Sequence, residues 1–223
     1  MKKPPLWKKC SRVFHEQARE YDSWFDSNLL FEIEKSAIRE LPIQPSTCRP
    51  SLEIGCGTGR FGEALQIEYG IDPATGPLQL ARSRGMKCSN GIGEALPFTH
   101  DAFGSVYLLF TLCFLENPAQ ALIECRRVLK KDGMLIIGFI PASSSWGISL
   151  QKKKEEGNEF YKYCTFYGCS NVLEMLSMAG FEVLHSISSL FQSPDDLSQV
   201  EYGQPGLDTR AGFIALAAKA INS

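Results

Sequence analysis

The segment from residue 51 to residue 62, Ser-Leu-Glu-Ile-Gly-Cys-Gly-Thr-Gly-Arg-Phe-Gly, constrains the fold of this chain more than any other. Leu52 and Ile54 flank Glu53 and predict the end of a short buried strand. Three glycines then follow at every second position: Gly55, Gly57 and Gly59. Apolar residues at helical spacing come next, so the segment predicts a strand, a tight turn and a helix start. Because glycine lacks a Cβ, such a turn lets a ligand approach its backbone closely.

The spacing of these glycines separates two classes of nucleotide-binding protein. A dinucleotide-binding fingerprint, G-x-G-x-x-G, needs its third glycine three positions after the second, and that position here is Arg60. The pattern Glu-x-Gly-x-Gly-x-Gly instead resembles the first motif of class I S-adenosylmethionine-dependent methyltransferases. A pyrophosphate is anionic and favours a helix N-terminus, whereas S-adenosylmethionine carries an ammonium and a sulfonium, which suit the nearby acid Glu53. An NAD-dependent oxidoreductase is the alternative that Arg60 disfavours.

An acidic residue ends the next predicted strand, Tyr69-Gly70-Ile71-Asp72-Pro73. Asp72 follows Gly55 at nearly the spacing of about 20 residues that places an acid on ribose hydroxyls in such units. Alone, a strand-end aspartate is an ordinary cap, but beside the glycine turn Asp72 becomes a candidate for ribose binding, with Pro73 ending the strand.

The segment Gly-Ile-Gly-Glu-Ala-Leu-Pro-Phe, residues 91–98, resembles the methyltransferase phrase G-D-A-E-x-L-P-F that lies along the adenine. The resemblance implies that Gly93 and Glu94 contact the cofactor. The chain departs from the phrase at Ile92, where the family often has an acid that accepts from the adenine amino group. Backbone groups near Gly93 and Glu94 then remain to read the ring edge.

The apolar run from Phe103 to Phe110 predicts the central strand of the sheet. Ligands of open parallel sheets lie beyond the carboxyl ends of the strands, so Phe110, Thr111 and Cys113 are expected near the methyl donor. The phrase from residue 126 to residue 135 closely resembles the family's R-V-L-K-P-G-G-x-L. The cofactor-binding set that follows is Glu53, Gly55, Cys56, Gly57, Gly59, Asp72, Pro73, Gly93, Glu94, Phe110 and Thr111.

Two regions outside this core are candidates for the substrate side. Residues 1–12 are basic and rich in proline, which predicts loose order, and residues 13–41 predict helices with a break at 26–28, so that 1–49 form a helical cap. Residues 18–25 resemble the family's segment that closes over the cofactor, which makes Tyr21 and Trp24 substrate candidates; helix packing is the other interpretation of these aromatics.

Residues 141–167 break the strand–helix alternation and are rich in aromatic residues. Insertions at this point commonly form the substrate side of these enzymes, and aromatic side chains there suit an apolar or cationic acceptor. Trp146, together with Cys113, completes the predicted substrate set. The alternative is a lid that packs on itself, and Lys152–Lys154 followed by two glutamates indicate a solvated face.

The fold that these segments predict is a single α/β domain spanning residues 1–223. It is a Rossmann-like, seven-stranded, mostly parallel sheet with helices on both faces and an antiparallel last strand. The cofactor-binding core spans 50–140. Residues 168–223 supply a helix and two late strands, and the absence of a helix between those strands predicts antiparallel pairing.

Composition narrows the function. The 23 basic and 25 acidic residues give a net charge of −2, which does not favour nucleic-acid binding. No stretch is apolar and long enough to span a membrane, and the basic N-terminus lacks the apolar run of a signal peptide. None of the eight cysteines forms C-x-x-C, so we expect no metal site and mostly reduced, buried thiols in a cytoplasmic protein.

The expected activity is S-adenosylmethionine-dependent methyl transfer to a small-molecule acceptor, in a protein resembling the small methylases of ubiquinone and menaquinone biosynthesis. No catalytic residue is evident: His15, His100 and His185 are each interpreted as structural. Two alternatives stay open. One is a non-catalytic module that binds the cofactor, and the other is a thiol or metalloid methyltransferase that uses several cysteines. The sequence indicates neither the acceptor nor the oligomeric state.

Overall fold

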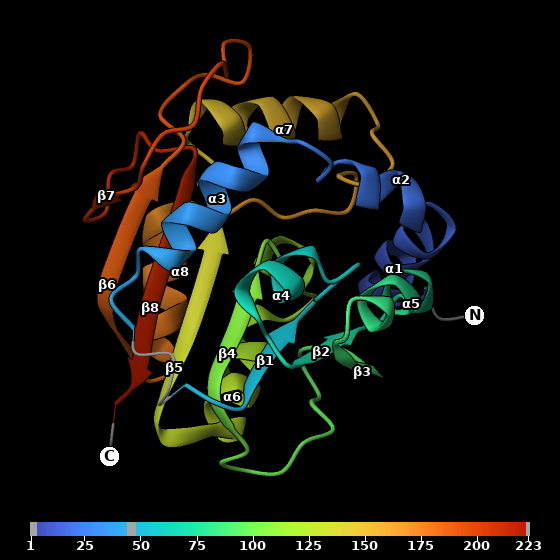
Figure 1. Cartoon of the computed structure of the whole chain (residues 1–223), viewed down its shortest axis with the longest axis vertical. Helices are drawn as coiled ribbons and strands as arrows, with labels where there is room; N and C mark the ends of the chain where they lie inside the picture. The colour runs from blue at the N-terminus through green and yellow to red at the C-terminus, as the bar shows by residue number, and fades with distance from the viewer. Residues whose placement is uncertain (1–3, 44–47, 222–223) are drawn as a thin grey trace.

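The computed structural model describes residues 4–43 and 48–221, which form one mixed sheet with helices on both faces (Figure 1). The strands are β1 Ser51–Ile54, β2 Tyr69–Asp72, β3 Lys87–Asn90, β4 Phe103–Leu109, β5 Leu129–Phe139, β6 Phe181–Ser189, β7 Gln204–Pro205 and β8 Phe213–Ala220. The helices are α1 Leu6–Glu16, α2 Ala18–Ser23, α3 Leu29–Arg39, α4 Arg60–Leu65, α5 Thr75–Ser83, the 3-10 turn η1 Leu112–Phe114, α6 Pro118–Val128, α7 Ser145–Glu155 and α8 Cys169–Met178.

The strand order is β3-β2-β1-β4-β5-β8-β6-β7, and the first five strands pair in parallel. Strand β8 pairs antiparallel with both β5 and β6, which confirms the predicted antiparallel end of the sheet. The predicted count of seven strands was wrong by one within the described residues. The additional strand, β7, has two residues and pairs with β6 at Ile187 and Ser188, so a segment rich in turn residues gave no strand pattern.

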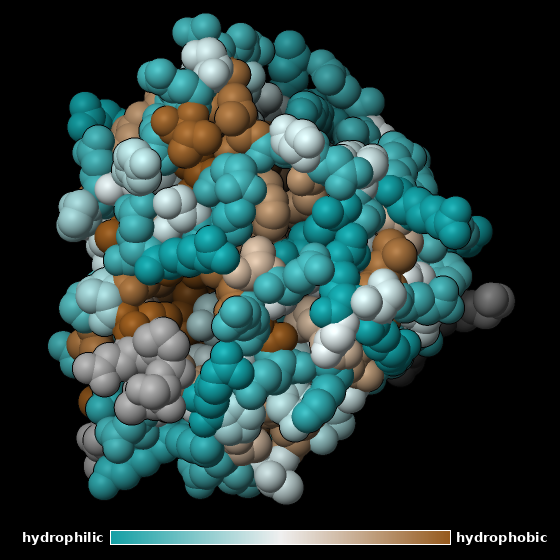
Figure 2. All heavy atoms as spheres, in the orientation of Figure 1, coloured by the Kyte–Doolittle hydropathy of each residue, from teal (hydrophilic) through white to brown (hydrophobic). Residues whose placement is uncertain are grey.

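Each face of the sheet carries its own apolar core. Alternate residues of β5 point to opposite faces: Leu135 and Ile137 pack in the core under α6 and α8, and Ile136 packs in the core under α3, α4 and α5. All three are 0% exposed. The outer surface shown in Figure 2 is mainly hydrophilic, with apolar side chains in small separate areas. None of the helices formed by residues 4–43 and 48–221 is long and apolar enough to cross a membrane.

Regular structure in the N-terminal cap begins closer to the start of the chain than the sequence predicted. Helix α1 begins at Leu6 because Cys10 and Val13 bury one of its faces, so the expected loose order over residues 1–12 was wrong for residues 6–12; residues 1–3 lie outside the described part. The predicted break near residue 27 is confirmed, since Asn28 caps α3 by accepting from Leu30 N at 2.9 Å.

Strand β5 begins at Leu129, directly after the last residue of α6. Its register against β4 shifts between Phe103 and Ser105, where the intervening residues bulge. Gly104 lies so close to the backbone of Cys48 and Arg49 that a Cβ would be 2.5 Å from it, which explains the absence of a side chain at this crowded strand start. The insertion at 141–167 contains α7, capped by Ser144, whose Oγ accepts from Gly147 N at 3.0 Å.

Candidate functional site

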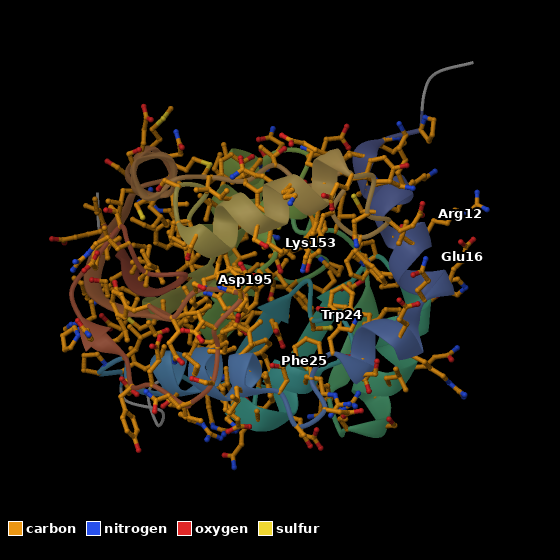
Figure 3. The ribbon with its side chains drawn as sticks, turned by 90° about the horizontal axis from the view of Figure 1, so that it is seen from above. Arg12, Glu16, Trp24, Phe25, Lys153 and Asp195 are labelled. Atoms are coloured by element: carbon orange, nitrogen blue, oxygen red, sulfur yellow. The ribbon has the colours of Figure 1, made fainter. Side chains whose placement is uncertain are left out.

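A cavity of about 780 Å³ lies at the carboxyl ends of β1, β2 and β4, beneath the N-terminal cap and α7. Figure 3 looks toward this end of the sheet, where Trp24 and Phe25 of the cap face Lys153 of α7 and Asp195, and all four line the cavity. The position agrees with the rule that ligands of open α/β sheets bind beyond the carboxyl strand ends.

The glycine turn brings bare backbone to the cavity wall. Gly55 and Gly57 both have positive φ, at 71° and 52°, a conformation that side chains disfavour. A Cβ on Gly57 would lie 3.2 Å from the ring of Tyr21, and one on Gly55 would lie 2.5 Å from Thr111 Oγ1. Thr111 Oγ1 lies 2.9 Å from Ile54 O, so this hydroxyl joins the ends of β4 and β1. Side chains at the two glycines would therefore block the wall.

Asp72 holds the turn from the next strand. Its Oδ2 accepts from Gly57 N at 2.9 Å, and its Oδ1 accepts from Ala74 N at 2.7 Å. Burial raises the pKa of Asp72 to about 6, although these two backbone donors act in the opposite direction. Asp72 and Pro73 both line the cavity. Each carboxylate oxygen has a second lone pair, so Asp72 can accept from a ligand while it keeps the turn in place.

The segment predicted to lie along the adenine also reaches the cavity, through Gly93, Glu94 and Ile92. The carboxylate of Glu94 is engaged elsewhere: its Oε1 accepts from Glu116 N at 2.9 Å and from Asn117 N at 3.2 Å. Glu94 thus fixes the chain before α6, a structural task that the motif did not reveal.

Phe110 ends β4 in the left-handed region, with φ of 56°. Its ring stacks on Phe213 at 5.1 Å between centroids and contacts Phe61 at 5.5 Å. A bulky residue in this conformation is strained, and such strain is common at ligand sites. Phe110 and Thr111 both line the cavity, where the sequence placed them.

Three predicted cofactor residues are not among those that line the cavity: Glu53, Cys56 and Gly59. Glu53 is 2% exposed and lies behind the turn, its Oε2 3.2 Å from where a Cβ on Gly62 would be, and that oxygen lacks a partner among the described residues. Cys56 packs against Gly70. Gly59 permits close packing, because a Cβ there would lie 2.9 Å from Ala81 Cα of α5. These residues support the turn from beneath.

All four predicted substrate residues line the cavity: Tyr21, Trp24, Cys113 and Trp146. The aromatic ones also pack on their neighbours. Tyr21 meets Trp24 at 5.4 Å between ring centroids, and Trp24 meets Phe160 at 4.7 Å. Trp146 Nε1 donates to Gln192 O at 2.8 Å. The two interpretations that the sequence left open, pocket wall and packing aromatic, therefore both describe these side chains.

An ionic cluster fastens the cap to the glycine turn. Arg60 donates to both carboxylate oxygens of Asp22, at 2.9 and 2.8 Å, and to Asp26 at 2.7 Å. Arg84 donates to the same Asp22 at 2.8 Å. Burial tends to raise the pKa of Asp22, but the hydrogen bonds from Arg60 and Arg84 outweigh it and lower the pKa to about 2. Arg60, which stands where a dinucleotide fingerprint needs a glycine, therefore holds the cap to the turn.

The sequence did not single out Glu34, a cavity-lining carboxyl on the inner face of α3. The available signal was its position within an apolar helical stripe, four residues after Leu30 and before Ile38. The three histidines do not line the cavity. His15 instead accepts from Gly76 N through Nδ1 at 3.0 Å, in agreement with a structural role.

Six of the eight cysteines are buried. Within the described ranges no group of His, Cys, Asp or Glu has an arrangement that would hold a metal ion. Cys113 Sγ donates to Phe110 O at 3.3 Å. Contact with Cys113, together with burial, raises the pKa of Cys164. Burial raises the pKa of Cys10 to about 11, so both neighbours of Cys113 are neutral thiols.

Known proteins match this chain over the same regions. A family model described as a methyltransferase domain matches residues 52–137. A solved structure from Thermotoga maritima, described as an S-adenosylmethionine-dependent methyltransferase and possible histamine N-methyltransferase, is 31% identical; it covers 96% of this chain and 99% of its own, with a TM-score of 0.86. Uncharacterized proteins from Methanocaldococcus jannaschii and Mycobacterium tuberculosis are 37% and 36% identical over 213 residues. Both matches cover 94% of this chain, and 99% and 74% of the relatives.

The Thermotoga maritima match extends along both chains almost completely, and the domain match includes the glycine turn, Asp72 and the end of β4. These are the segments that form the cavity wall described above. The chain therefore belongs to the class I S-adenosylmethionine-dependent methyltransferases.

Proposed function

We propose that this protein transfers the methyl group of S-adenosylmethionine to a small-molecule acceptor held beside the cofactor in the 780 Å³ cavity. The observation that carries the proposal is the continuity of the cavity. One part of its lining, the turn end, consists of the glycine turn, Asp72 and Gly93. Another part, the acceptor end, consists of aromatic side chains from the cap and α7, such as Trp24 and Trp146. A single cavity with two such parts suits two ligands that must meet.

The residues present fit the cofactor. Asp72 offers free lone pairs to the ribose hydroxyls, and the backbone at Gly93 and Glu94 offers polar groups to the adenine edge, with Ile92 as an apolar neighbour. Gly55, Phe110 and Thr111 lie where the methionine end would pass between β1 and β4. Glu53 lies behind the turn, 2% exposed and outside the cavity lining, where it supports the glycine backbone. Cys56, Gly59 and Pro73 shape the backbone that makes these contacts.

Bound S-adenosylmethionine supplies an activated methyl: the acceptor's lone pair forms a bond to the methyl carbon while the S–C bond breaks and its electron pair stays on sulfur. The protein's own part is to position the reactants and to exclude water. The ion pairs of Asp22 hold the cap in place over the turn for this purpose. A general base is needed only if the nucleophile must lose a proton, and the histidines lie outside the cavity lining.

Two measurements test the proposal. Titration with S-adenosylmethionine and with NAD should show binding of the first alone, and an acceptor screen should show release of S-adenosylhomocysteine. Because the Thermotoga maritima neighbour is described as a possible histamine N-methyltransferase, amines belong in the screen beside phenols, thiols and quinones. The narrower resemblance to quinone methylases remains a prediction that the same screen tests. Cofactor binding without turnover across the panel would favour a non-catalytic module instead.

A further inference from the structure

Glu34 is a buried carboxyl on a helix face that is otherwise apolar. It is 5% exposed, and its neighbours on the inner face of α3, Ile33, Ala37 and Ile38, are 2% exposed or less. Helix α3 packs against β6 and β8 through this face. A carboxyl group in such surroundings is costly unless a partner compensates for the loss of water.

Within residues 4–43 and 48–221, no side chain or backbone group donates a hydrogen bond to Glu34 or forms an ion pair with it; this includes Lys153, which lines the same cavity. Burial alone raises the pKa of Glu34 well above its usual range. Glu32 on the same helix is the contrast, since its half-exposed carboxylate pairs with Lys35 at 2.6 Å. Glu34 is therefore a buried acid whose partner is not part of the described fold.

The carboxyl lies at the acceptor end of the cavity. Glu34 lines it one helical turn beyond Leu30 and Phe31. Its charge contributes to the raised pKa of Tyr161, after burial and the thiols of Cys164 and Cys113. It also contributes, after burial, to the raised pKa of Tyr21, on which Asp72 has the larger effect. Glu34 is therefore close to the aromatic side chains of the cavity, whereas the carboxylate of Asp72 is held by the backbone of the glycine turn.

We propose that Glu34 binds the cationic group of the methyl acceptor, which makes the acceptor a small protonated amine; this rests on the proposed function. An ammonium compensates a buried carboxylate through charge and through donated hydrogen bonds, and a neutral acceptor leaves it uncompensated. The surrounding rings add to the preference, because aromatic faces such as those of Trp24 and Tyr161 attract cations. They also provide the apolar surface that the body of the amine needs.

The test measures binding rather than turnover, so it stands apart from the activity screen. The full-length protein is saturated with S-adenosylhomocysteine and titrated with histamine, phenethylamine and tryptamine. Each amine is paired with an analogue in which methyl replaces the ammonium: 4-propylimidazole, propylbenzene and 3-propylindole. We expect at least one amine to bind about tenfold or more tightly than its analogue, a preference of the size expected for one charge-assisted contact. Glu34→Gln should abolish that preference, and Glu32→Gln on the same helix should keep it.

S-adenosylhomocysteine also carries an ammonium group. Its affinity for the Glu34→Gln protein therefore shows whether Glu34 binds the cofactor or the acceptor. We expect Glu34→Gln to change it less than about twofold, while the amine preference falls about tenfold. A tenfold loss of affinity for S-adenosylhomocysteine would assign Glu34 to the cofactor and overturn the proposal. Equal binding of amines and analogues, no binding of any amine, or an unchanged preference in a folded Glu34→Gln protein would overturn it as well. Turnover of an acceptor with no positive charge would do the same.

Discussion

The two ends of the cavity are built in different ways. At the turn end, the wall is backbone from short segments that each follow a strand, and its polar groups are already paired, as Asp72 is with Gly57 N and Ala74 N. At the acceptor end, the wall is made of side chains from segments far apart in the chain, where Trp24 meets Phe160 at 4.7 Å and Glu34 lacks a partner within the described residues. The carboxylate of Asp72 at the turn end therefore has partners without a ligand, whereas the carboxyl of Glu34 at the acceptor end has none within the described residues.

This difference indicates that the turn end serves cofactor binding, the function shared by methyltransferases, and that the acceptor end serves the recognition of a particular acceptor. Backbone groups held by a turn recognise the same ligand whatever the neighbouring side chains, so the turn end can remain while other parts of the chain change. Side chains on a cap and an insertion can be exchanged without disturbing the sheet. We therefore expect substitutions at the turn end to affect cofactor affinity and those at the acceptor end to affect the acceptor.

The largest effect is expected for Gly57→Val. A branched side chain there would occupy the position 3.2 Å from the Tyr21 ring and would strain a backbone with φ of 52°. Affinity for S-adenosylhomocysteine should fall about 100-fold or more, the equivalent of about 2.7 kcal/mol. Gly157→Val is the matched control, because Gly157 also has positive φ, at 83°, but a Cβ there meets nothing within 4 Å. Unchanged affinity in a folded Gly57→Val protein would remove the turn from the binding site.

Asp72→Asn is expected to weaken the same ligand by about 10- to 100-fold, because a charged acceptor of ribose hydrogen bonds is lost. The affinity of the parent protein for this ligand should also depend on pH. With a pKa of about 6, Asp72 is ionised above pH 7, so affinity should be highest there and should fall as the pH drops through 6 and the carboxyl takes up a proton. Calorimetry between pH 5 and pH 8 should show this fall in the parent and a flatter profile in Asp72→Asn. Parallel profiles would exclude Asp72 as the titrating contact.

Eight of the eleven residues predicted to bind the cofactor line the cavity, whereas the sequence pointed to only part of the acceptor end, for a physical reason. Gly55, Gly57 and Asp72 lie within one strand–turn–helix–strand unit, so local spacing determines where they meet. The contact between Trp24 and Phe160 depends on how two distant segments fold over the sheet, which no local pattern encodes. Glu34 was visible only as an acid in an apolar stripe, and ordinary helices tolerate such residues at their edges.

Trp24→Leu is expected to raise the KM for the acceptor about tenfold and to leave affinity for S-adenosylhomocysteine nearly unchanged. The ring lies between Phe160 and Tyr161, at 4.7 and 6.2 Å, so leucine would remove aromatic surface from the acceptor wall. Tyr202→Leu provides a control, because it removes a 79% exposed ring that does not line the cavity. An equal loss of affinity for both ligands would mean that Trp24 only holds the cap in place.

Asp22→Asn should loosen the cap, because it removes the shared partner of Arg60 and Arg84. Burial favours protonation of Asp22, but the two arginines lower its pKa to about 2, below the value of 3.8 for an unpaired aspartate. The stabilisation is therefore present above about pH 4 and is lost as the pH falls toward 2. After allowance for solvent screening we expect about 1 kcal/mol at pH 7, measured by urea denaturation. The difference between parent and Asp22→Asn should shrink at pH 3; a constant difference would contradict an ionic anchor.

The smallest effect is expected for Cys113→Ser, which separates a pocket-lining thiol from a reactive one. Cys113 lines the cavity and donates to Phe110 O at 3.3 Å, a hydrogen bond that serine can replace. Cys10 and Cys164 beside it are neutral thiols, and the described residues hold no metal-binding arrangement, so the surroundings do not form a thiolate cluster for a metalloid. Turnover should therefore fall only about two- to threefold, with affinity for S-adenosylhomocysteine retained, because the thiolate that serine cannot supply is not needed. Complete loss of turnover with intact cofactor binding, or a methylated Cys113 found by mass spectrometry, would favour the thiol methyltransferase alternative and place the chemistry on the protein itself.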